Sequence, residues 1–302
     1  MILPEEIKIT NGDNISQNAD FEVNPKSIEY STSRNLSCAD LISINRGLNL
    51  ISEFYDVNAA CSVKIGGICA AALGQSLADA IQKIMDSNPV DFMSSVIVVS
   101  TEVNSEIAKY LKDSNIIVAP KFTQNAIEIL NMHNIRYMKV KTPLKDYKNY
   151  IPEEIKVTPL GTFIQSPNLS ELDKDSFKVV TKQKPTVEQI EDAVFAWKVA
   201  KHVNSQAIVI AKDFKAIGIG QGQTSRIDAF EIALNKACDG SKDAVAASDG
   251  FFPAIDNIQV AAQGRIAAII QPGGSIKDDE VIKTADKYNI AMVTTGIRHF
   301  KH

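Results

Sequence analysis

A glycine-rich turn followed by an arginine is the stretch of this sequence best suited to hold a ligand. Residues 217–237 read IGIGQGQTSRIDAFEIALNKA, after a strand-like apolar run at 207–212. Glycines let a backbone turn sharply and approach a ligand closely, and Arg226, at the start of the expected helix, offers a planar fork to phosphate or carboxylate. The spacing is not a dinucleotide fingerprint, because the third glycine comes too early and no acidic residue follows at the expected distance. The segment therefore indicates an anionic or carbonyl-bearing ligand without identifying it.

The composition is that of a globular protein large enough for two domains. The chain has 302 residues, of which 45% are hydrophobic and 23% charged, and its net charge of −4 argues against a broad surface for nucleic acid. No apolar run approaches the ~20 residues that span a bilayer, and the N-terminus lacks a signal-peptide core. The four cysteines form no Cys-x-x-Cys pair and the four histidines show no ligand spacing, which favours reduced thiols and no metal site. We expect a cytoplasmic protein that binds neither nucleic acid nor membrane.

Strand-like and helical runs alternate in the same order in both halves of the chain. In each half a glycine-glutamine pair, Gly74-Gln75 or Gly222-Gln223, opens a helix, and a proline, Pro120 or Pro272, follows the third strand. The expected strands lie at 59–64, 96–100, 116–119 and 136–140, and then at 207–212, 244–248, 266–270 and 290–294. This order predicts a layered α/β fold with mostly parallel strands, built by internal duplication from units at 1–175 and 176–302.

Two further segments frame these units. Residues 1–35 are polar and rich in Asn and Ser, which predicts an irregular arm. Between the halves, Thr186 and Gln189 form a capping box before a helix that is expected to end near His202. We assign His133 and His202 to structural roles.

Six segments of the second half carry a family resemblance. They are VVTKQKPT (179–186), FAWKVAKHVNSQAIV (195–209), GIGQGQTSR (218–226), ASDGFFPAIDN (247–257), IIQPGGSIKDDEVI (269–282) and MVTTGIRHFKH (292–302). Together they resemble 5-aminoimidazole-4-carboxamide ribonucleotide (AICAR) transformylase, the C-terminal domain of the bifunctional purine-biosynthesis enzyme whose N-terminal domain is IMP cyclohydrolase. The resemblance covers essentially the whole chain and is strongest from Val157 onward.

The resemblance implies a fold, a reaction and an assembly. The fold would be two tandem cytidine-deaminase-like α/β units without zinc. The reaction would transfer a formyl group from the co-substrate 10-formyltetrahydrofolate to the 5-amino group of AICAR, at active sites on the subunit interface of a homodimer. The cyclohydrolase domain is not expected here. Some relatives bind a monovalent cation near the C-terminus, and that cation stays open for this chain.

The resemblance also assigns site residues one by one. Lys64 matches the lysine of the family's catalytic Lys-His pair, and His302 matches a terminal histidine near that pair. The positions that match the nucleotide site are Gly161, Gln206, Arg226, Phe251 and Arg298. The positions that match the folate site are Ile227, Pro253, Asp256 and Ser275. From the residues alone, Lys64 could equally be a surface lysine, Arg298 a surface ion pair and Asp256 part of an Asp-Asn turn.

Several family positions carry other residues here. Ile65 stands where the family has its catalytic histidine, and Thr10 stands where it has a nucleotide-site arginine. Asn88 stands at the first position of the family's Asp-Pro-Val motif. Gln206 replaces an asparagine and Ala254 replaces a second aromatic. Losing a general acid or base typically lowers a rate by about 10² to 10⁴, so positioning and electrostatics could still sustain the reaction, with His302, Lys64 or the substrate handling the proton. Two alternatives remain: a catalytically impaired homologue that binds nucleotide or folate in a regulatory or partner-dependent role, and an enzyme with a changed acceptor or donor.

Overall fold

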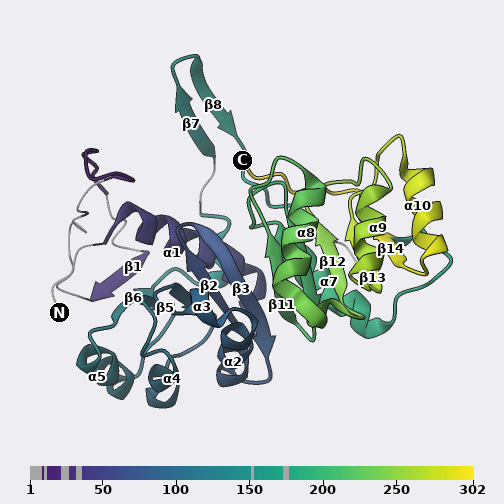
Figure 1. Ribbon diagram of the computed structural model, residues 1–302. Coiled ribbons are helices and arrows are strands. Elements are labelled where there is room, and N and C mark those ends of the chain that lie inside the picture. The colour runs from purple at the N-terminus through teal and green to yellow at the C-terminus, as the bar shows by residue number, and fades with distance from the viewer. Residues whose placement is uncertain (1–8, 10–11, 22–26, 32–35, 151–152, 173–176) are drawn as a thin grey trace.

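The computed structural model describes the whole chain except residues 1–8, 10–11, 22–26, 32–35, 151–152 and 173–176, and one mixed sheet crosses the described part (Figure 1). Its 12 strands follow the order β1-β6-β5-β4-β2-β3-β11-β10-β12-β13-β14-β9. The strands are β1 Ile28–Ser31, β2 Asn58–Lys64, β3 Gly67–Gly74, β4 Val96–Val99, β5 Ile116–Ala119, β6 Arg136–Val140, β9 Lys178–Val179, β10 Ile208–Lys212, β11 Lys215–Gly220, β12 Val245–Ser248, β13 Ala268–Gln271 and β14 Ala291–Thr294. A separate hairpin is formed by β7 Glu154–Thr158 and β8 Gly161–Gln165.

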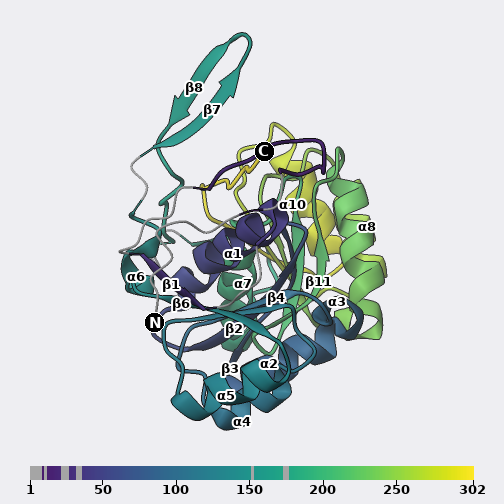
Figure 2. The same ribbon diagram turned by 90° about the vertical axis from the view of Figure 1, so that its left-hand side faces the viewer.

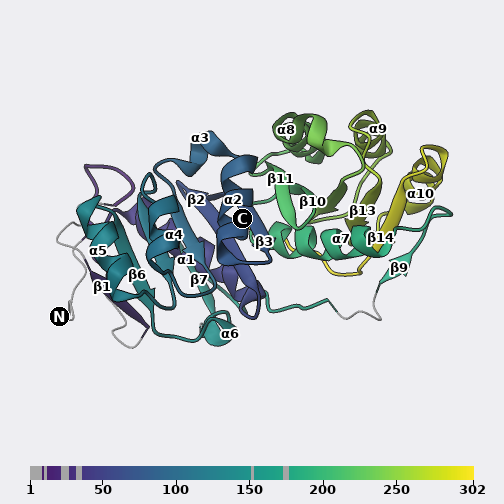
Figure 3. The ribbon, with the colours of Figure 1, turned by 90° about the horizontal axis from the view of Figure 1, so that it is seen from below.

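Helices cover both faces of the sheet. They are α1 Cys38–Ile51, α2 Leu77–Ser87, α3 Pro89–Phe92, α4 Ser105–Tyr110, α5 Gln124–Met132, α6 Leu144–Tyr147, α7 Val187–Ala200, α8 Arg226–Ala237, α9 Asp256–Gln263 and α10 Asp278–Lys287. Figure 3 shows α7 on one side of the second half and α8, α9 and α10 on the other. The capping box predicted for α7 is confirmed, since Thr186 Oγ1 accepts from Gln189 N and Gln189 Oε1 accepts from Thr186 N. Within the described ranges, no helix is long and apolar enough to span a membrane.

The core is continuous on one face of the sheet and divided on the other. Alternate residues of a strand point to opposite faces, so Cys61 and Val209 join the cluster under α1 and α7, which runs across both halves. Ala60, next to Cys61, packs on the other face under α2, α4 and α5. Ile208, next to Val209, packs on that face under α8, α9 and α10, in a separate cluster. The face that carries α1 and α7 therefore holds the two halves together.

The sheet is mixed, which corrects the expectation of mostly parallel strands. β4, β5 and β6 pair in parallel, as do β12, β13 and β14, but the hairpins β2–β3 and β10–β11 place antiparallel pairs at the centre. Sequence patterning missed β3 and β11 because their alanines and glycines lack the branched side chains that mark strands. The irregular arm expected at 1–35 contains strand β1, which pairs with β6, and the β7–β8 hairpin was also missed.

The glycines of β11 face a helix. A Cβ added to Gly218 would lie 2.0 Å from the carbonyl oxygen of Ala233, and one added to Gly220 would lie 1.8 Å from that of Ala229. Helix α8 therefore packs its backbone directly on β11, and only glycine fits between them. Gly222, in contrast, has open space around it, and glycine is favoured there because its φ of +68° lies in the left-handed region.

A buried ion network ties the two halves together near the end of α7. The Glu53 carboxylate accepts hydrogen bonds from Lys201 Nζ at 2.8 Å and His202 Nε2 at 3.2 Å, and all three side chains are at least 90% buried. Burial alone would raise the pKa of Glu53, but the contacts with His202 and Lys201 outweigh it and lower that pKa below its usual range. Burial lowers the pKa of His202 to about 4 and that of nearby His299 to about 3. His202 is therefore a neutral donor to an ionised Glu53 at neutral pH.

The glycine packing predicts a graded stability series. We expect Gly220→Ala to lower the free energy of unfolding by about 3 kcal/mol, because the new methyl group overlaps the backbone of α8. Gly222→Ala should cost about 1 kcal/mol through its positive φ alone. Gly240→Ala, whose Cβ would meet only Ile217 Cδ1 at 3.4 Å, is the matched control. Urea denaturation measures all three, and equal losses at positions 220 and 240 would contradict the packing explanation.

The buried histidines predict a loss of stability in acid. Between about pH 6.5 and pH 4 the unfolded chain takes up protons on these histidines and the native chain does not, so stability falls as the pH falls, by on the order of 2 kcal/mol per histidine. Glu53 extends the loss below about pH 4.5, because its native pKa is lowered. Denaturation of His299→Gln at several pH values should give a shallower dependence than the parent protein. His133→Gln removes an exposed histidine and should leave the slope unchanged; an equal effect of both variants would refute the assignment.

Candidate functional site

The strand ends that carry the expected site residues from both halves meet at one edge of the sheet. Lys64 ends β2, and its hairpin partner Gly67 begins β3. Gln221, directly after β11, donates from Nε2 to the carbonyl of Ile68 at 3.1 Å. Because β3 and β11 run antiparallel, the turn after Lys64 and the glycine turn before α8 lie at the same edge.

Arg226 is buried at the start of α8 and turns toward the protein. Its Nη2 contacts Asp249 Oδ1 at 2.8 Å, and its Nη1 donates to the carbonyl of Phe251 at 3.0 Å. The Asp249 side chain is 0% exposed, so this is a fully buried ion pair. The guanidinium fork therefore holds the loop that follows β12 and fixes where Phe251 can lie.

The C-terminal segment 298–302 lies along the same loop. His299 N donates to the carbonyl of Asp249 at 2.8 Å, and Ser205 Oγ donates to Asp249 Oδ2 at 2.6 Å. Ser205 N and Lys301 O are 2.9 Å apart, as are Lys301 N and Ser205 Oγ. The Arg298 guanidinium lies 5.1 Å from the centre of the Phe300 ring, which is 5.9 Å from the ring of His302. Arg298 and His302 are thereby brought to the loop that Arg226 holds.

Gln206 completes this group. Its Nε2 donates to the carbonyl of Thr224 at 3.2 Å, and its backbone N donates to Gln223 O at 3.0 Å. Its Oε1 is buried and has no hydrogen-bond partner in the described part of the chain, which leaves one acceptor for a ligand. Gln206 and Arg226 thus lie at one edge with Phe251, Arg298 and His302.

The four positions that the resemblance assigns to the folate site follow the carboxyl ends of β11, β12 and β13, which run in the same direction in the sheet. Ile227 lies in the first turn of α8 after β11, Pro253 and Asp256 follow β12, and Ser275 follows β13. In parallel strands these ends share one edge, where α/β sheets bind ligands. Asp256 Oδ1 accepts from both nitrogens of Asn257 at 2.8 Å, and Ser275 Oγ accepts from Lys277 N at 3.2 Å. Oδ2 of Asp256 is not used by these bonds.

Lys64 has a carboxylate neighbour that sequence patterning did not identify. Its Nζ lies 3.5 Å from Asp91 Oδ1, and Asp91 Oδ2 accepts from Asn88 Nδ2 at 2.9 Å. The next residue, Ile65, is 85% exposed with a φ of 51°. A β-branched residue is strained in this left-handed region, so the turn holds Ile65 outward at a backbone geometry that costs energy.

Gly161 is not brought to these residues within one chain. It lies at the turn of the β7–β8 hairpin, exposed and with a φ of +143°, and both Figure 1 and Figure 2 show the hairpin projecting from the body. The hairpin contacts the C-terminal segment through Lys156 Nζ, which donates to the main-chain oxygen of His302 at 2.7 Å. Thr10 lies outside the described residues.

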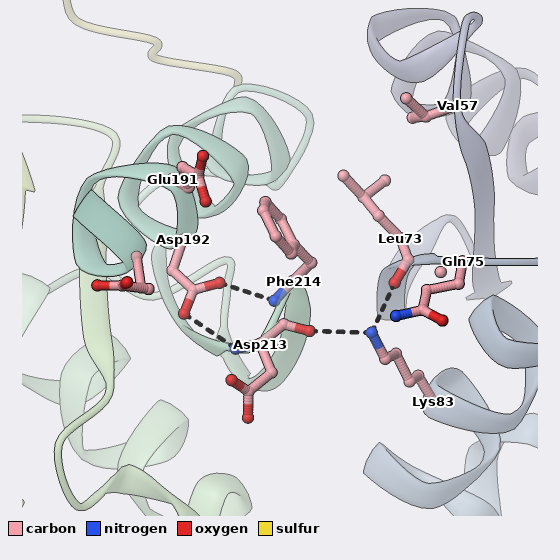
Figure 4. Close-up of a pocket in the computed structure, with 10 residues that line it drawn as sticks. Val57, Leu73, Gln75, Lys83, Glu191, Asp192, Asp213 and Phe214 are labelled. Atoms are coloured by element: carbon pink, nitrogen blue, oxygen red, sulfur yellow. Dashed lines mark hydrogen bonds between the residues drawn. The ribbon is translucent and has the colours of Figure 1, made fainter.

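A cavity of about 510 Å³ is lined by none of the expected site residues (Figure 4). Its wall includes Val57, which precedes β2, and Asp213, which follows β10, whereas the site residues Lys64 and Gln206 lie at the opposite ends of these two strands. Lys83 closes it by donating to the carbonyls of Leu73 and Asp213. The cavity is therefore at the other edge of the sheet from the site.

Asp249 is the site residue that the sequence analysis overlooked. It anchors Arg226, Ser205 and His299 at once. Its signal in the sequence is an aspartate directly after the buried strand VAAS, in the segment ASDGFFPAIDN. In the described ranges, His, Cys, Asp and Glu side chains form no group of three or more that could hold a metal ion.

Comparison with known proteins identifies relatives of this chain. A model of the AICARFT/IMPCHase bienzyme family matches residues 3–236. The chain is 39% identical over 301 residues to the bifunctional purine biosynthesis protein PurH of Anoxybacillus flavithermus, covering 96% of this chain and 58% of that protein. The PurH protein of Caldicellulosiruptor saccharolyticus is 38% identical over 307 residues, covering 98% and 59%.

The match does not extend over the whole of these relatives. The chain spans somewhat over half of their length, and 52% of the PurH protein of Acetivibrio thermocellus, with which it is 40% identical over 275 residues. The family model nevertheless covers most of the chain from its first strand through α8. The chain belongs to the AICARFT/IMPCHase bienzyme family.

Proposed function

We propose that this protein is the formyltransferase of its family, which transfers a formyl group from 10-formyltetrahydrofolate to the 5-amino group of AICAR. One observation carries the proposal. Four residues that the resemblance assigns to the nucleotide site converge from four separate stretches of sequence at one edge of the sheet: Gln206, Arg226, Phe251 and Arg298. The folate-type positions follow strand ends at the same edge. Such convergence of polar groups at the carboxyl ends of strands is typical of α/β ligand sites.

The reaction needs alignment, oxyanion stabilisation and proton removal. The acceptor amine is conjugated to a carboxamide and is a poor nucleophile, so it must be held against the formyl carbon. A bond forms between the amine nitrogen and the formyl carbon, the bond from that carbon to the folate nitrogen breaks, and the amine proton leaves as the folate nitrogen gains one. The tetrahedral oxyanion formed on the way requires donors fixed in advance.

The chain offers residues for each of these tasks. Lys64, held beside Asp91, would donate to the developing oxyanion or to the departing folate nitrogen. His302, anchored through Lys156 and next to Phe300, would take part in moving the proton. Gln206 and Arg298 would bind the nucleotide. Arg226 would act indirectly, by holding Phe251 beside the ring of the nucleotide base.

The mirrored strand order supports a duplicated architecture. From the central pair outward, the first half runs β3, β2, β4, β5, β6 and the second runs β11, β10, β12, β13, β14, with one inner helix each, α1 and α7. We infer two related cytidine-deaminase-like units at 1–175 and 176–302. In this scheme the site forms at the edge of the sheet where strands from both units carry the expected site residues.

The projecting hairpin supports a homodimer. Ile155, Val157 and Ile164 are 60%, 79% and 56% exposed and lie on one face of it, since Ile155 pairs directly with Ile164. A two-stranded hairpin is only marginally stable alone in water, and an apolar face of this kind marks an interaction site. We infer that it packs on a second copy of the chain and carries Gly161 toward that copy's nucleotide site.

A second candidate function rests on Ile65. Ile65 is exposed and strained, and the resemblance matches this position to the family's catalytic histidine. No described histidine other than His302 lies exposed at the site. The protein would then be an impaired homologue that binds nucleotide or folate without efficient turnover.

The activity test separates these two candidates. With AICAR and 10-formyltetrahydrofolate we expect tetrahydrofolate release, a kcat about 10²-fold lower in Lys64→Met, and a higher kcat in Ile65→His. Lys109→Met, exposed on α4, is the matched control. AICAR binding by calorimetry without turnover in the parent protein would favour the impaired homologue. If neither AICAR nor the folate binds, the proposal is wrong.

The hairpin predicts a change of assembly state. The double variant Ile155→Ser/Val157→Ser should shift the sedimentation of the protein from dimer to monomer, because the apolar face is lost. Met132→Ser, which removes a 72% exposed methionine from α5, should have no effect. A parent protein that sediments as a monomer at every concentration would rule out this role of the hairpin.

A further inference from the structure

Two cationic residues, Arg46 and Lys301, contact the consecutive residues Asn204 and Ser205 beside the proposed nucleotide site. Arg46 of α1 donates from Nη1 to the carbonyl of His202 at 3.0 Å and to Asn204 Oδ1 at 2.7 Å. Lys301 is paired through its backbone with Ser205, the next residue. Both cations are half-buried. Arg46 thus approaches from the first half of the chain and Lys301 from the C-terminal segment.

Neither cation has an anionic partner among the residues that the structure describes. No carboxylate lies within 4.0 Å of either side chain in these ranges. Burial lowers the pKa of Lys301, and the nearby charge of Arg46 lowers it further, with Glu154 opposing them only in part. Burial also lowers the pKa of Arg46. Both cations are therefore held where their charge is poorly compensated.

The carboxylates of the surrounding cluster are already engaged. Glu53 is bound by Lys201 and lies 3.7 Å from Lys148, which also pairs with Glu171. Glu154 accepts from Gln165 Nε2 at 2.7 Å. Lys156 donates to the last residue of the segment, His302. The carboxylates near Arg46 and Lys301 are thus held by other groups.

A phosphate group matches this arrangement in charge and in shape. Burying a cation without a partner is costly, and the cost is removed when an anion binds. A phosphate monoester carries close to two negative charges at neutral pH. Arginine presents a fork that fits phosphate oxygens and lysine adds a point charge.

We propose that Arg46 and Lys301 together form a binding site for a phosphate group. In the proposed function this group is the 5′-phosphate of the ribonucleotide, so that assignment rests on the proposed function. The two residues are not among those that the resemblance assigns. They supply positive charge in a chain where the resemblance matches Thr10 to an arginine of the nucleotide site, and Lys301 belongs to the same C-terminal segment as Arg298.

The first test needs only inorganic phosphate. At constant ionic strength, phosphate should raise the unfolding temperature of the parent protein more than chloride does. Lys301→Met should unfold at a higher temperature than the parent without phosphate, because an uncompensated cation is gone, and should lose at least tenfold in phosphate affinity. Lys301→Gln, which keeps hydrogen-bonding groups, should also lose affinity. Lys283→Met, exposed on α10, is the control and should respond like the parent.

The opposite results would overturn the site. Lys301→Met that unfolds at a lower temperature and keeps its response to phosphate would mean that Lys301 is paired within the protein. Equal stabilisation of parent and Lys301→Met by phosphate would mean a general salt effect. Arg46→Gln with unchanged phosphate affinity would remove the arginine from the site.

A second test separates this site from the proposed function. With AICAR as acceptor, Lys301→Met should raise KM at least tenfold and change kcat by less than threefold, because uniform binding is lost. Turnover of AICAR with an unchanged KM would sink the phosphate site while the formyltransferase stands. Phosphate binding that depends on Arg46 and Lys301, in a protein that does not bind AICAR, would uphold the site and sink the proposed function.

Discussion

The buried carboxylate of Glu53 is the interaction on which the arrangement of the site depends. It comes from the turn after α1, in the first half, and binds Lys201 and His202 at the end of α7, in the second. A buried charge that lost its partners would be strongly destabilising, so this contact fixes where α7 ends. The segment 203–206 starts from that point and carries Ser205 and Gln206 to the edge of the sheet, where Ser205 receives the C-terminal segment.

A second buried ion pair, Arg226 with Asp249, also connects segments that are far apart in the chain. Arg226 and Asp249 neutralise each other in the second half, and Asp249 also accepts from Ser205 and, through its carbonyl, from His299. One aspartate therefore connects the start of α8, the segment after α7 and the C-terminal segment. Residues expected to touch a ligand thus divide into those that hold the loops, such as Arg226, and those left with free polar atoms, such as Gln206. Only the second kind is available for recognition.

The elements that could be predicted from the sequence are those whose side chains have a clear propensity and pattern. The capping box at Thr186 and the branched runs of β4, β5 and β14 were identified because propensity and pattern agree there. β3 and β11 were not, since their alanines and glycines are chosen for close packing against α2 and α8 rather than for strand propensity. The site residues were located by resemblance, but the roles of Asp249 and Asp91 depend on contacts between segments far apart in the chain, which no local pattern encodes.

The glycine turn illustrates how packing and function share residues. Its spacing first indicated close approach to a ligand, yet Gly218 and Gly220 admit the backbone of α8. That close approach brings the first turn of α8 against β11 and so aims Arg226 into the loop after β12 rather than outward to solvent. If α8 stood further from the sheet, the guanidinium could not reach both Asp249 and the carbonyl of Phe251. The glycines therefore serve the site indirectly, by setting the distance at which a buried cation can organise the loop that faces the ligand.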